Sequence, residues 1–247
     1  MIVLSCDFGL EGPYIGQVKA ALYQDAPRSH IIDLFSDLPV YNPHAASALL
    51  AAYSPVFPAD TVFLSIVDPG VGMSNRRGVV VQSCDHWFVG PDNGLFNGVM
   101  KRDGNAKWWE IIWRPTQLSN TFHGRDLFAP VAAAIASCAF PSEKLRPMAF
   151  PDLTTVDADY AAVAYIDHFG NLISGIRAEA VLNTTTLALC HEEIVYARTF
   201  GEVEVGELFW YKNANGLIEI AVNCGSAAKM VGAVVGDRIS LSFPGAP

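Results

Sequence analysis

The chain has 247 residues, of which 51% are hydrophobic and only 17% are charged, and its formal net charge is −9. This negative charge argues against binding to nucleic acid, which depends on Lys and Arg residues that neutralise phosphates, and it favours a small molecule as the ligand. The low charged fraction favours burial of a further face in a homo-oligomer. The chain has neither an apolar run of about 20 residues nor a basic signal-peptide start. We therefore expect a cytoplasmic protein without a membrane span.

Up to residue 150 the sequence alternates between strand and helix patterns. Apolar or β-branched runs that end in turn residues predict strands at 2–6, 29–34, 61–67, 78–82 and 87–89. Helical spacing or a high alanine content predicts helices at 14–23, 42–53 and 127–138. This alternation predicts an α/β domain with a largely parallel sheet.

The pattern changes at a proline-rich stretch that contains Pro141, Pro147 and Pro151. Beyond it, short strands separated by Gly and Asn turns are predicted at 161–166, 172–176, 185–189, 206–211, 217–222 and 238–243. Many short strands with little helix indicate a small β-barrel or sandwich. We therefore predict an N-terminal α/β domain over residues 1–150 and a smaller C-terminal β domain over residues 151–247.

Several common site motifs are absent. The five cysteines include no C-x-x-C pair, which argues against a zinc ribbon or a disulfide framework and favours free thiols in a reducing compartment. The sequence has no phosphate-binding G-x-x-x-x-G-K-[ST] or G-x-G-x-x-G loop, which disfavours ATP hydrolysis and nicotinamide chemistry. It also lacks the G-x-S-x-G motif, which disfavours a serine hydrolase.

Acidic residues follow two of the predicted strands. Asp7 is placed either to grip the hydroxyls of a ribose, as carboxylates do in nucleotide-binding α/β proteins, or to cap the next helix. Asp68 begins the sequence D-P-G-V-G, in which glycines let the backbone approach a ligand closely; a structural turn aspartate is the alternative. Arg76 and Arg77 follow, and either could fold back on Asp68.

A second polar cluster occurs in the sequence T-F-H-G-R-D. His123 lies between an aromatic residue and a glycine, so we expect its imidazole in a turn rather than along a helix. Arg125 and Asp126 are interpreted as a local ion pair or a helix cap. Because polar residues at strand ends line the ligand crevices of α/β sheets, an active site that includes Asp68 and His123 is the leading interpretation.

In the C-terminal half, Asp167, Phe169 and Asn171 leave a predicted strand at a glycine turn. They offer an aromatic ring and hydrogen-bonding groups for a base or an amino-acid group, and ordinary hairpin chemistry explains them equally well. Three tryptophans are interpreted as core or interface anchors: Trp108, Trp109 and Trp113.

Six stretches carry a resemblance to a known family: CDFGLEGPYIGQVKA, IVDPGVG followed by RR, FVGPDNGLF, TFHGRDLFAPVAA, IDHFGNLISGI and NGLIEIAVNCGSAA. They extend from residue 6 to residue 228 and cover nearly the whole chain. In these stretches the sequence resembles the S-adenosylmethionine hydroxide adenosyltransferases, which are related to enzymes that use fluoride or chloride as the nucleophile.

The resemblance implies an N-terminal α/β domain and a C-terminal β-barrel. It also implies a homotrimer whose active sites lie between the N-terminal domain of one subunit and the C-terminal domain of its neighbour. The implied reaction is hydrolysis of S-adenosyl-L-methionine to adenosine and L-methionine, with no cofactor and no metal. The chain shows no counterpart of the extra loop of the halide-using relatives, so we expect water as the nucleophile.

The catalytic residues implied by the resemblance correspond to Asp68, Arg76 and His123. The arginine pair stands one residue further from the aspartate than in the family pattern, which leaves Arg77 as the alternative. We expect Arg76 to stabilise the developing hydroxide, His123 to accept the proton and Asp68 to orient both of them.

The resemblance also implies contacts with the substrate. Asp7 would hold the ribose diol, and backbone groups around Asn223 and Cys224 would read the adenine edge. Asn213 and Asn215 stand where the halide-using relatives carry a Ser-Arg pair that grips the methionine carboxylate. Contacts with the methionine part and the adenosine, from across the subunit boundary, would come from Asp167, Phe169 and Asn171.

Two other interpretations remain open. Asp7, Asp68, Asp126 and His123 could bind a divalent metal in a phosphoesterase-like hydrolase. Alternatively, the protein could be a non-catalytic nucleoside-binding trimer.

Overall fold

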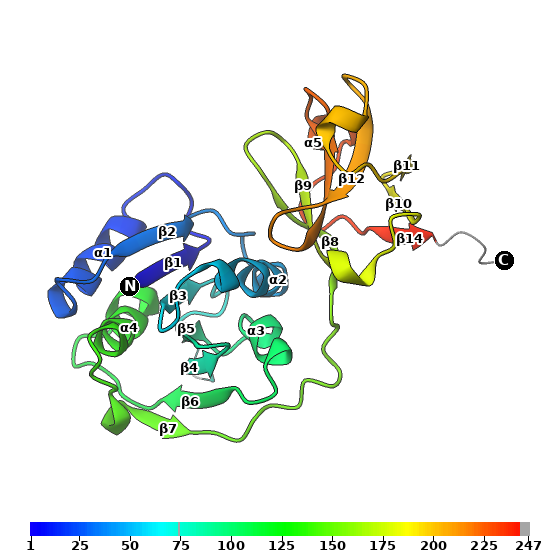
Figure 1. The fold of residues 1–247 in the computed structure, drawn as a ribbon. Helices are drawn as coiled ribbons and strands as arrows, with labels where there is room; N and C mark the ends of the chain where they lie inside the picture. Colours follow the sequence, from blue (N-terminus) through cyan, green and yellow to red (C-terminus); the bar gives the residue numbers. More distant parts are fainter. Residues whose placement is uncertain (74, 243–247) are drawn as a thin grey trace. The chain divides into compact units, whose positions relative to one another are not determined.

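The computed structural model describes residues 1–73 and 75–242 of the chain. These residues form two compact units, the first of which spans Met1–Val156 and the second of which begins at Asp157 (Figure 1). Each unit has a hydrophobic core of its own.

The first unit is built on a seven-stranded sheet with the order β2-β1-β3-β5-β4-β6-β7. Strands β2, β1, β3 and β5 pair in parallel, whereas β4, β6 and β7 add an antiparallel edge. The predicted α/β fold with a largely parallel sheet is thereby confirmed. In chain order the strands are β1 (Ile2–Cys6), β2 (Ile31–Phe35), β3 (Val62–Ile66), β4 (Gly78–Ser83), β5 (His86–Pro91), β6 (Lys107–Ile111) and β7 (Leu145–Pro147).

Helices cover both faces of this sheet. Helices α1 and α4 pack on one face, where they enclose a core with Ile2, Leu4 and Cys6 of β1, and α2 and α3 lie on the opposite face (Figure 1). The helices are α1 (Tyr14–Asp25), α2 (Pro43–Tyr53), α3 (Asn97–Arg102) and α4 (Ala129–Ala136). Across residues 1–73 and 75–242, no helix is long and apolar enough to cross a membrane.

The ends of two predicted helices follow from local chemistry. Helix α2 begins where predicted because the Asn42 side chain accepts a hydrogen bond of 3.0 Å from the N–H of Ala45, while Pro43 occupies the first helical position. The helix predicted at 127–138 is shorter than expected. A π-helical turn, η2 (Gly124–Phe128), occupies its start, and α4 begins only at Ala129.

Several elements were not predicted from the sequence: α3, β6 and β7 in the first unit and two short elements in the second. Strand β6 has the sequence K-W-W-E-I, in which apolar and polar residues do not alternate. Trp108 of this strand is 9% exposed, and the ring of Trp109 lies 5.9 Å from that of Trp87. These two tryptophans therefore pack within the first unit, as core anchors do.

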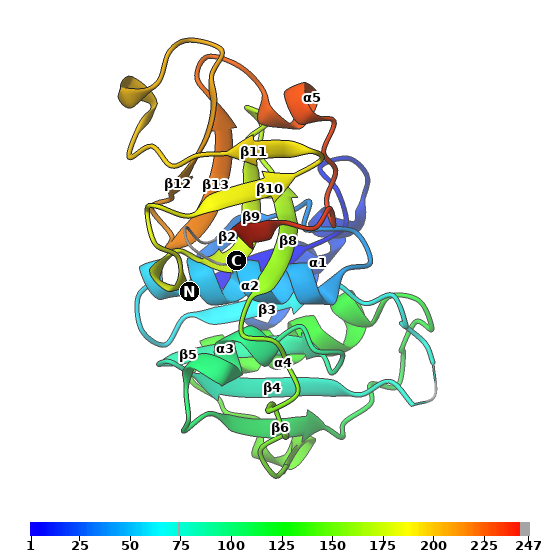
Figure 2. The ribbon, with the colours of Figure 1, turned by 90° about the vertical axis from the view of Figure 1, so that its right-hand side faces the viewer.

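The second unit is formed by antiparallel strands in two sheets, with the orders β12-β13-β9-β8 and β11-β10-β14 (Figure 2). The predicted β character is confirmed, while closure of the two sheets into a barrel stays a prediction. Phe243, the last residue of the strand predicted at 238–243, lies outside the described residues. The elements are β8 (Tyr160–Ile166), β9 (Leu172–Arg177), β10 (Thr186–Leu189), β11 (Glu192–Ile194), β12 (Leu208–Lys212), β13 (Leu217–Val222), α5 (Ala227–Val231) and β14 (Ser240–Ser242).

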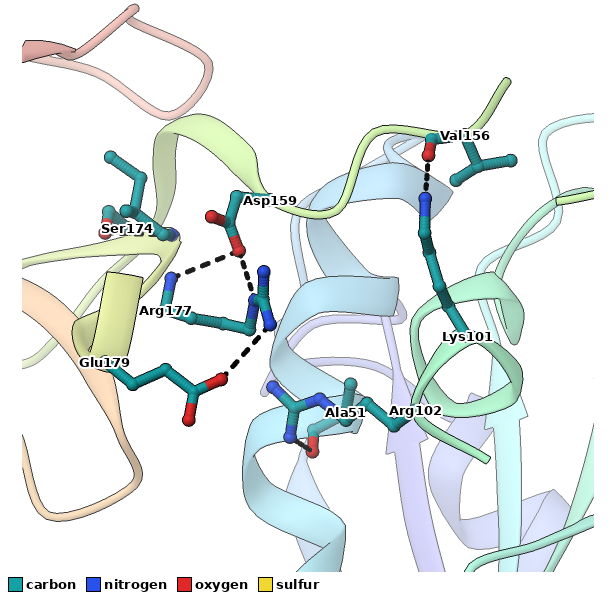
Figure 3. A network of polar contacts seen from close by, with 9 residues as sticks. Ala51, Lys101, Arg102, Val156, Asp159, Ser174, Arg177 and Glu179 are labelled. Carbon is teal, nitrogen blue, oxygen red and sulfur yellow. Dashed lines mark hydrogen bonds and ion pairs between the residues drawn. The ribbon is translucent and has the colours of Figure 1, made fainter. Parts of the chain in front are cut away.

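The segment around residues 153–159, where the first unit ends and the second begins, is held by contacts within each unit (Figure 3). In the first unit, Lys101 Nζ of α3 donates hydrogen bonds to the carbonyl groups of Leu153 and Val156. In the second unit, Arg177 Nε lies 2.7 Å from Asp159 Oδ1. These contacts attach residues 153–156 to the first unit; the division of the chain into domains 1–150 and 151–247 stays a prediction.

A titratable side chain is buried in the first unit. His86 is 4% exposed, and its ring lies 5.4 Å from the ring of Phe63 and 6.4 Å from that of Phe88. Burial lowers the pKa of His86, although the charges of Asp85 and Asp60 oppose the shift. The imidazole is therefore neutral in the folded protein at neutral pH.

We expect His86 to make the fold sensitive to mild acid. Its pKa is lower in the folded chain than the ordinary value of about 6.5, so the unfolded chain takes up the proton first as the pH falls. Stability should therefore decrease as the pH falls from about 6.5 towards the pKa of the folded state, by up to about 1.4 kcal/mol for each unit of pKa difference. Urea unfolding at a series of pH values measures this loss.

The variant His86→Gln keeps a hydrogen-bond donor but does not titrate. Its free energy of unfolding should change less than that of the wild type over the same pH range. An equal pH dependence in both proteins would show that His86 is not responsible.

Candidate functional site

Asp7 and Asp68 meet at one edge of the parallel sheet. Asp7 follows β1 and Asp68 lies two residues after β3, and the two strands are neighbours in parallel register, with Cys6 opposite Ile66. The N–H of Asp7 donates to the carbonyl of Ile66 at 3.2 Å. The carboxyl ends of parallel strands are the usual ligand-binding edge of such sheets.

Two glycines bring His123 to the same edge. Gly72 has a φ of 83°, and a Cβ there would overlap the carbonyl oxygen of Asn120. At Gly124 a Cβ would lie 2.8 Å from Cδ1 of Ile66. Only glycine therefore allows the D-P-G-V-G loop and the segment before η2 to pack this closely against each other and against β3.

A pocket of about 100 Å³ lies where these segments meet. Its lining includes three residues predicted for the site, Asp7, Asp68 and His123. The remaining lining residues are Phe8, Tyr41, Ile66, Val71, Thr121, Phe122 and Gly124. The volume is below the roughly 300–1,000 Å³ of pockets that enclose a whole small-molecule ligand.

The structure distinguishes between the two candidate arginines. Arg76 Nε lies 3.2 Å from Asp68 Oδ1, and the guanidinium occupies the space that a side chain at Gly70 would need. Arg77 instead pairs with Asp92 at 2.5 Å and is 51% exposed. Arg76 is thus the arginine next to Asp68.

Burial dominates the electrostatics of the site. The Asp68 side chain is 5% exposed, and burial raises its pKa, while the Arg76 guanidinium acts in the opposite direction. Burial lowers the pKa of His123, against the attraction of the Asp68 charge. Burial also raises the pKa of Asp7, with a further contribution from the charge of Asp68. A neutral imidazole thus lies near a carboxylate–guanidinium pair, an arrangement that can accept a proton from a bound molecule.

Tyr41 is a pocket residue that the sequence reasoning missed. Its N–H donates to Asp7 Oδ2 at 3.2 Å, and its φ of 59° is in the left-handed region. The side chain is 74% exposed although it lines the pocket. The only local signal is its place just before Asn42 and Pro43, which cap α2, and such a signal does not indicate a binding residue.

Arg125 and Asp126 form the local ion pair that was expected, with Nε and Nη2 of Arg125 2.6 and 3.0 Å from the two carboxylate oxygens. Neither residue lines the pocket. Among residues 1–73 and 75–242, no group of three or more His, Cys, Asp or Glu side chains is arranged to hold a metal ion.

In the second unit, Asp167 and Asn171 stabilise a tight turn between β8 and β9. The Asp167 carboxylate accepts hydrogen bonds from the N–H groups of Phe169 and Asn171 at 2.9 and 2.8 Å, and from Nδ2 of Asn171 at 3.0 Å. The ring of Phe169 is 73% exposed at the tip. Hairpin chemistry accounts for the polar pair, and the turn presents an aromatic ring to its surroundings.

This turn lies beside the segment that contains Asn223 and Cys224. The Gly170 carbonyl accepts a hydrogen bond of 2.9 Å from the N–H of Ala228. Asn223 Nδ2 is directed at the carbonyl groups of Phe200 and Val203, at 3.2 and 2.9 Å, so its side chain holds a neighbouring loop. Cys224 is exposed, with a φ of 56°.

Asn213 and Asn215 lie at the other end of the same strands. Strands β13 and β9 pair with Leu217 opposite Arg177 and Ile220 opposite Leu172, so the hairpin before Leu217 is separated from the Asn171 turn by the length of β13, roughly 17 Å. The Asn213 side chain donates to Glu219 at 3.0 Å and accepts from the N–H of Asn215 at 3.0 Å. The candidates of this unit therefore form two groups, at opposite ends of β13.

Comparison with known proteins identifies the family. Residues 2–145 match the SAM hydroxide adenosyltransferase N-terminal domain, and residues 161–240 match the SAM hydroxide adenosyltransferase C-terminal domain. The chain belongs to the SAM hydroxide adenosyltransferase family. The family membership predicted from the sequence is thus confirmed.

Relatives match this chain over nearly their whole length. It is 35% identical to an (R)-S-adenosyl-L-methionine hydrolase from Thermus thermophilus, over 95% of this chain and 96% of the relative. It is 33% identical to a protein of the same name from Salinispora tropica, over 98% and 97%, and 23% identical to a fluorinase from Nocardia brasiliensis, over 92% of each chain. A crystal structure of an uncharacterised conserved protein from Thermotoga maritima superposes with a TM-score of 0.86, at 33% identity, over 98% of this chain and all of the other.

These similarities bear on the interpretations left open. Family members named as hydrolases are enzymes, and the matches cover both domains. They favour neither the metal-dependent phosphoesterase nor the non-catalytic nucleoside-binding trimer.

The two adjacent arginines provide a matched test of the site. The positive charge of Arg76 lowers the pKa of Asp68, so Arg76→Gln should raise that pKa, whereas Arg77→Gln should leave it unchanged because Arg77 pairs with Asp92. Carboxyl ¹³C NMR titration of Asp68 measures both effects. An equal shift in the two variants would contradict the assignment of Arg76 to Asp68.

Proposed function

We propose that the protein hydrolyses S-adenosyl-L-methionine to adenosine and L-methionine. The observation that carries the proposal is the pocket in which Asp68, paired with Arg76, lies with His123. Relatives that match over nearly the whole chain are named (R)-S-adenosyl-L-methionine hydrolase, and the matched family domains are those of SAM hydroxide adenosyltransferases.

The chemistry needs a positioned oxygen nucleophile. The sulfonium of the substrate is already a good leaving group: the C5′–O bond forms as the C5′–S bond breaks, and the electron pair of the broken bond stays on sulfur, which becomes the neutral thioether of methionine. The remaining task is to align a water molecule with the C5′–S bond and to remove its proton. Because the pKa of free water lies far above neutral pH, a nearby cation and a base both assist its deprotonation.

In the proposed mechanism, the Arg76 guanidinium stabilises the charge that develops on the water oxygen. The neutral imidazole of His123 accepts the proton, and burial favours this neutral form. Asp68 orients Arg76 through their ion pair and stabilises the imidazolium that forms. The proton then passes from His123 to solvent.

Substrate binding in the proposal uses the first unit of one subunit and the second unit of a neighbouring subunit. Asp7 holds the ribose diol at the rim of the pocket, and Asn223 and Cys224 read the adenine edge through their backbone groups. The two ends of β13 suit opposite ends of an elongated ligand, so the hairpin of Asn213 and Asn215 contacts the methionine part. The turn formed by Asp167, Phe169 and Asn171 adds an aromatic surface.

We also propose that the protein is a homotrimer in which a neighbouring subunit completes each site. The pocket of about 100 Å³ is too small to enclose the whole substrate. Phe169, which is 73% exposed, supplies apolar surface for such a contact.

No cofactor takes part in the proposed reaction, and a cytoplasmic location fits the five free cysteines.

Removal of the proton-transfer groups should slow turnover selectively. The variants His123→Ala and Asp68→Ala should reduce kcat by about 10²- to 10⁴-fold, because they remove the base and its orienting charge, while substrate still binds. Incubation with S-adenosylmethionine in ¹⁸O-water, with and without chloride, followed by mass analysis measures the product. Labelled adenosine is expected in both conditions, and wild-type rates in both variants would contradict the assignment.

A matched control and a competing outcome complete this experiment. The variant Arg77→Gln, which removes an arginine paired with Asp92, should turn over at the wild-type rate. Formation of 5′-chloro-5′-deoxyadenosine would replace water with chloride as the nucleophile. Loss of activity on treatment with a chelator, restored by Mn²⁺ or Mg²⁺, would favour a metal-dependent reaction.

The rate should depend on pH through His123. Only the neutral imidazole accepts a proton, and its pKa lies below its ordinary value, so kcat/KM should be constant near neutral pH and decrease when the pH falls below the pKa of His123. The positive charge of Arg114 contributes to this low pKa. The variant Arg114→Gln should therefore move the acid limb of the profile to higher pH, and an unchanged profile would rule out His123 as the titrating base.

A further inference from the structure

The ion pair between Arg125 and Asp126 connects distant parts of the first unit. Arg125 Nε and Nη2 lie 2.6 and 3.0 Å from the two carboxylate oxygens of Asp126. The remaining terminal nitrogen, Nη1, donates a hydrogen bond of 2.9 Å to Oε1 of Gln17 on α1. The guanidinium therefore links the η2 turn to the first helix of the chain.

The same two side chains hold the segment that leads to His123. Asp126 Oδ2 accepts a hydrogen bond of 2.8 Å from the N–H of Ser119. The guanidinium carbon of Arg125 lies 5.0 Å from the centre of the Phe122 ring, a distance typical of cation–π contacts. The residue next to His123 and the start of its loop are thus both attached to this pair.

The backbone after His123 has an unusual conformation. Gly124–Phe128 form a π-helical turn directly after His123, and the N–H groups of both Arg125 and Asp126 approach the Phe122 carbonyl at 3.2 Å. Turns of this kind are rare and occur frequently at functional sites. Arg125 and Asp126 are the second and third residues of this turn, so their contacts lie near the point where it begins.

A second ion pair of the first unit has a more exposed arginine. Arg146 and Glu110 also form a pair, at 2.5 Å, between the edge strands β7 and β6. The Arg146 and Glu110 side chains are 64% and 14% exposed, and those of Arg125 and Asp126 are 35% and 13% exposed, so the two pairs differ in the exposure of the arginine. Exposed pairs contribute little to stability, which makes the Arg146 pair a suitable control.

We propose that Arg125 and Asp126 are positioning residues that hold the imidazole of His123 in the geometry for proton transfer. The four residues before them, Thr121 to Gly124, all line the pocket. The contacts of Arg125 and Asp126 are with Gln17, Ser119 and Phe122, so they act on the reaction through the loop that holds His123. This inference rests on the proposed function, in which His123 accepts the proton.

The test uses one variant for each attachment. Asp126→Asn removes the charge that pairs with Arg125, Arg125→Lys keeps the positive charge but loses the two-point pairing, and Gln17→Ala removes only the link to α1. Because a displacement of about 1 Å at a catalytic group costs on the order of 100-fold in rate, Asp126→Asn should lower kcat by about 10- to 100-fold while KM changes little. Arg125→Lys and Gln17→Ala should have smaller effects in the same direction.

Amide hydrogen exchange gives a second readout that does not need activity. Exchange should become faster in residues 119–124 of the variants and stay unchanged in β1 and α4. The control Arg146→Gln should alter neither kcat nor this exchange. If Asp126→Asn does not fold, Arg125→Lys and Gln17→Ala provide the same two readouts.

The outcomes separate the inference from the proposed function. A lower kcat with nearly constant KM and faster exchange in residues 119–124 supports the positioning role. Wild-type kcat in all three variants, or a rise in KM that accounts for the whole loss in kcat/KM, overturns it. If the wild type does not hydrolyse S-adenosylmethionine, the proposed function fails. In that case, unchanged amide hydrogen exchange in residues 119–124 of the variants would overturn the positioning role of Arg125 and Asp126 independently.

Discussion

The parallel register of β1 and β3 is the constraint on which the site depends. It places Asp7 and Asp68 at the same carboxyl edge, with a backbone hydrogen bond of 3.2 Å from Asp7 to Ile66. Gly72 and Gly124 then allow a second loop to approach this edge without side chains in the way. A change in this register would separate the two carboxylates, because each residue along a strand advances about 3.3 Å and reverses the direction of its side chain.

The second constraint is the burial of charge at this edge. A carboxylate that is 5% exposed is costly to remove from water unless an opposite charge accompanies it. Arg76 supplies that charge, and the absence of a side chain at Gly70 makes room for its guanidinium. The same burial lowers the pKa of His123. The burial that makes the Asp68 charge costly to desolvate therefore also keeps His123 as a neutral imidazole, the form that accepts a proton.

Most of the fold is predictable because its signals are local. The strands of the parallel sheet are short apolar runs that end in turns, and the start of α2 is marked by a capping asparagine followed by proline. Strand β6 lacks such a signal, since K-W-W-E-I has no alternation and is stabilised by pairing with β4 and β7. The π-helical turn at Gly124–Phe128 is also invisible in the sequence, where the predicted helix begins only at Leu127 and the segment around His123 is predicted as a turn.

The sequence by itself determined the α/β character of the first unit and the family, and it supplied the candidate residues of the site, because these depend on residue types and their order along the chain. Tertiary structure decided which of two adjacent arginines serves Asp68, since only the path of the loop directs Arg76 to Asp68 and Arg77 to Asp92. It also placed Tyr41 at the pocket and separated the candidates of the second unit into two groups. Such outcomes depend on distances between segments that are remote in the sequence, and no local pattern encodes those distances.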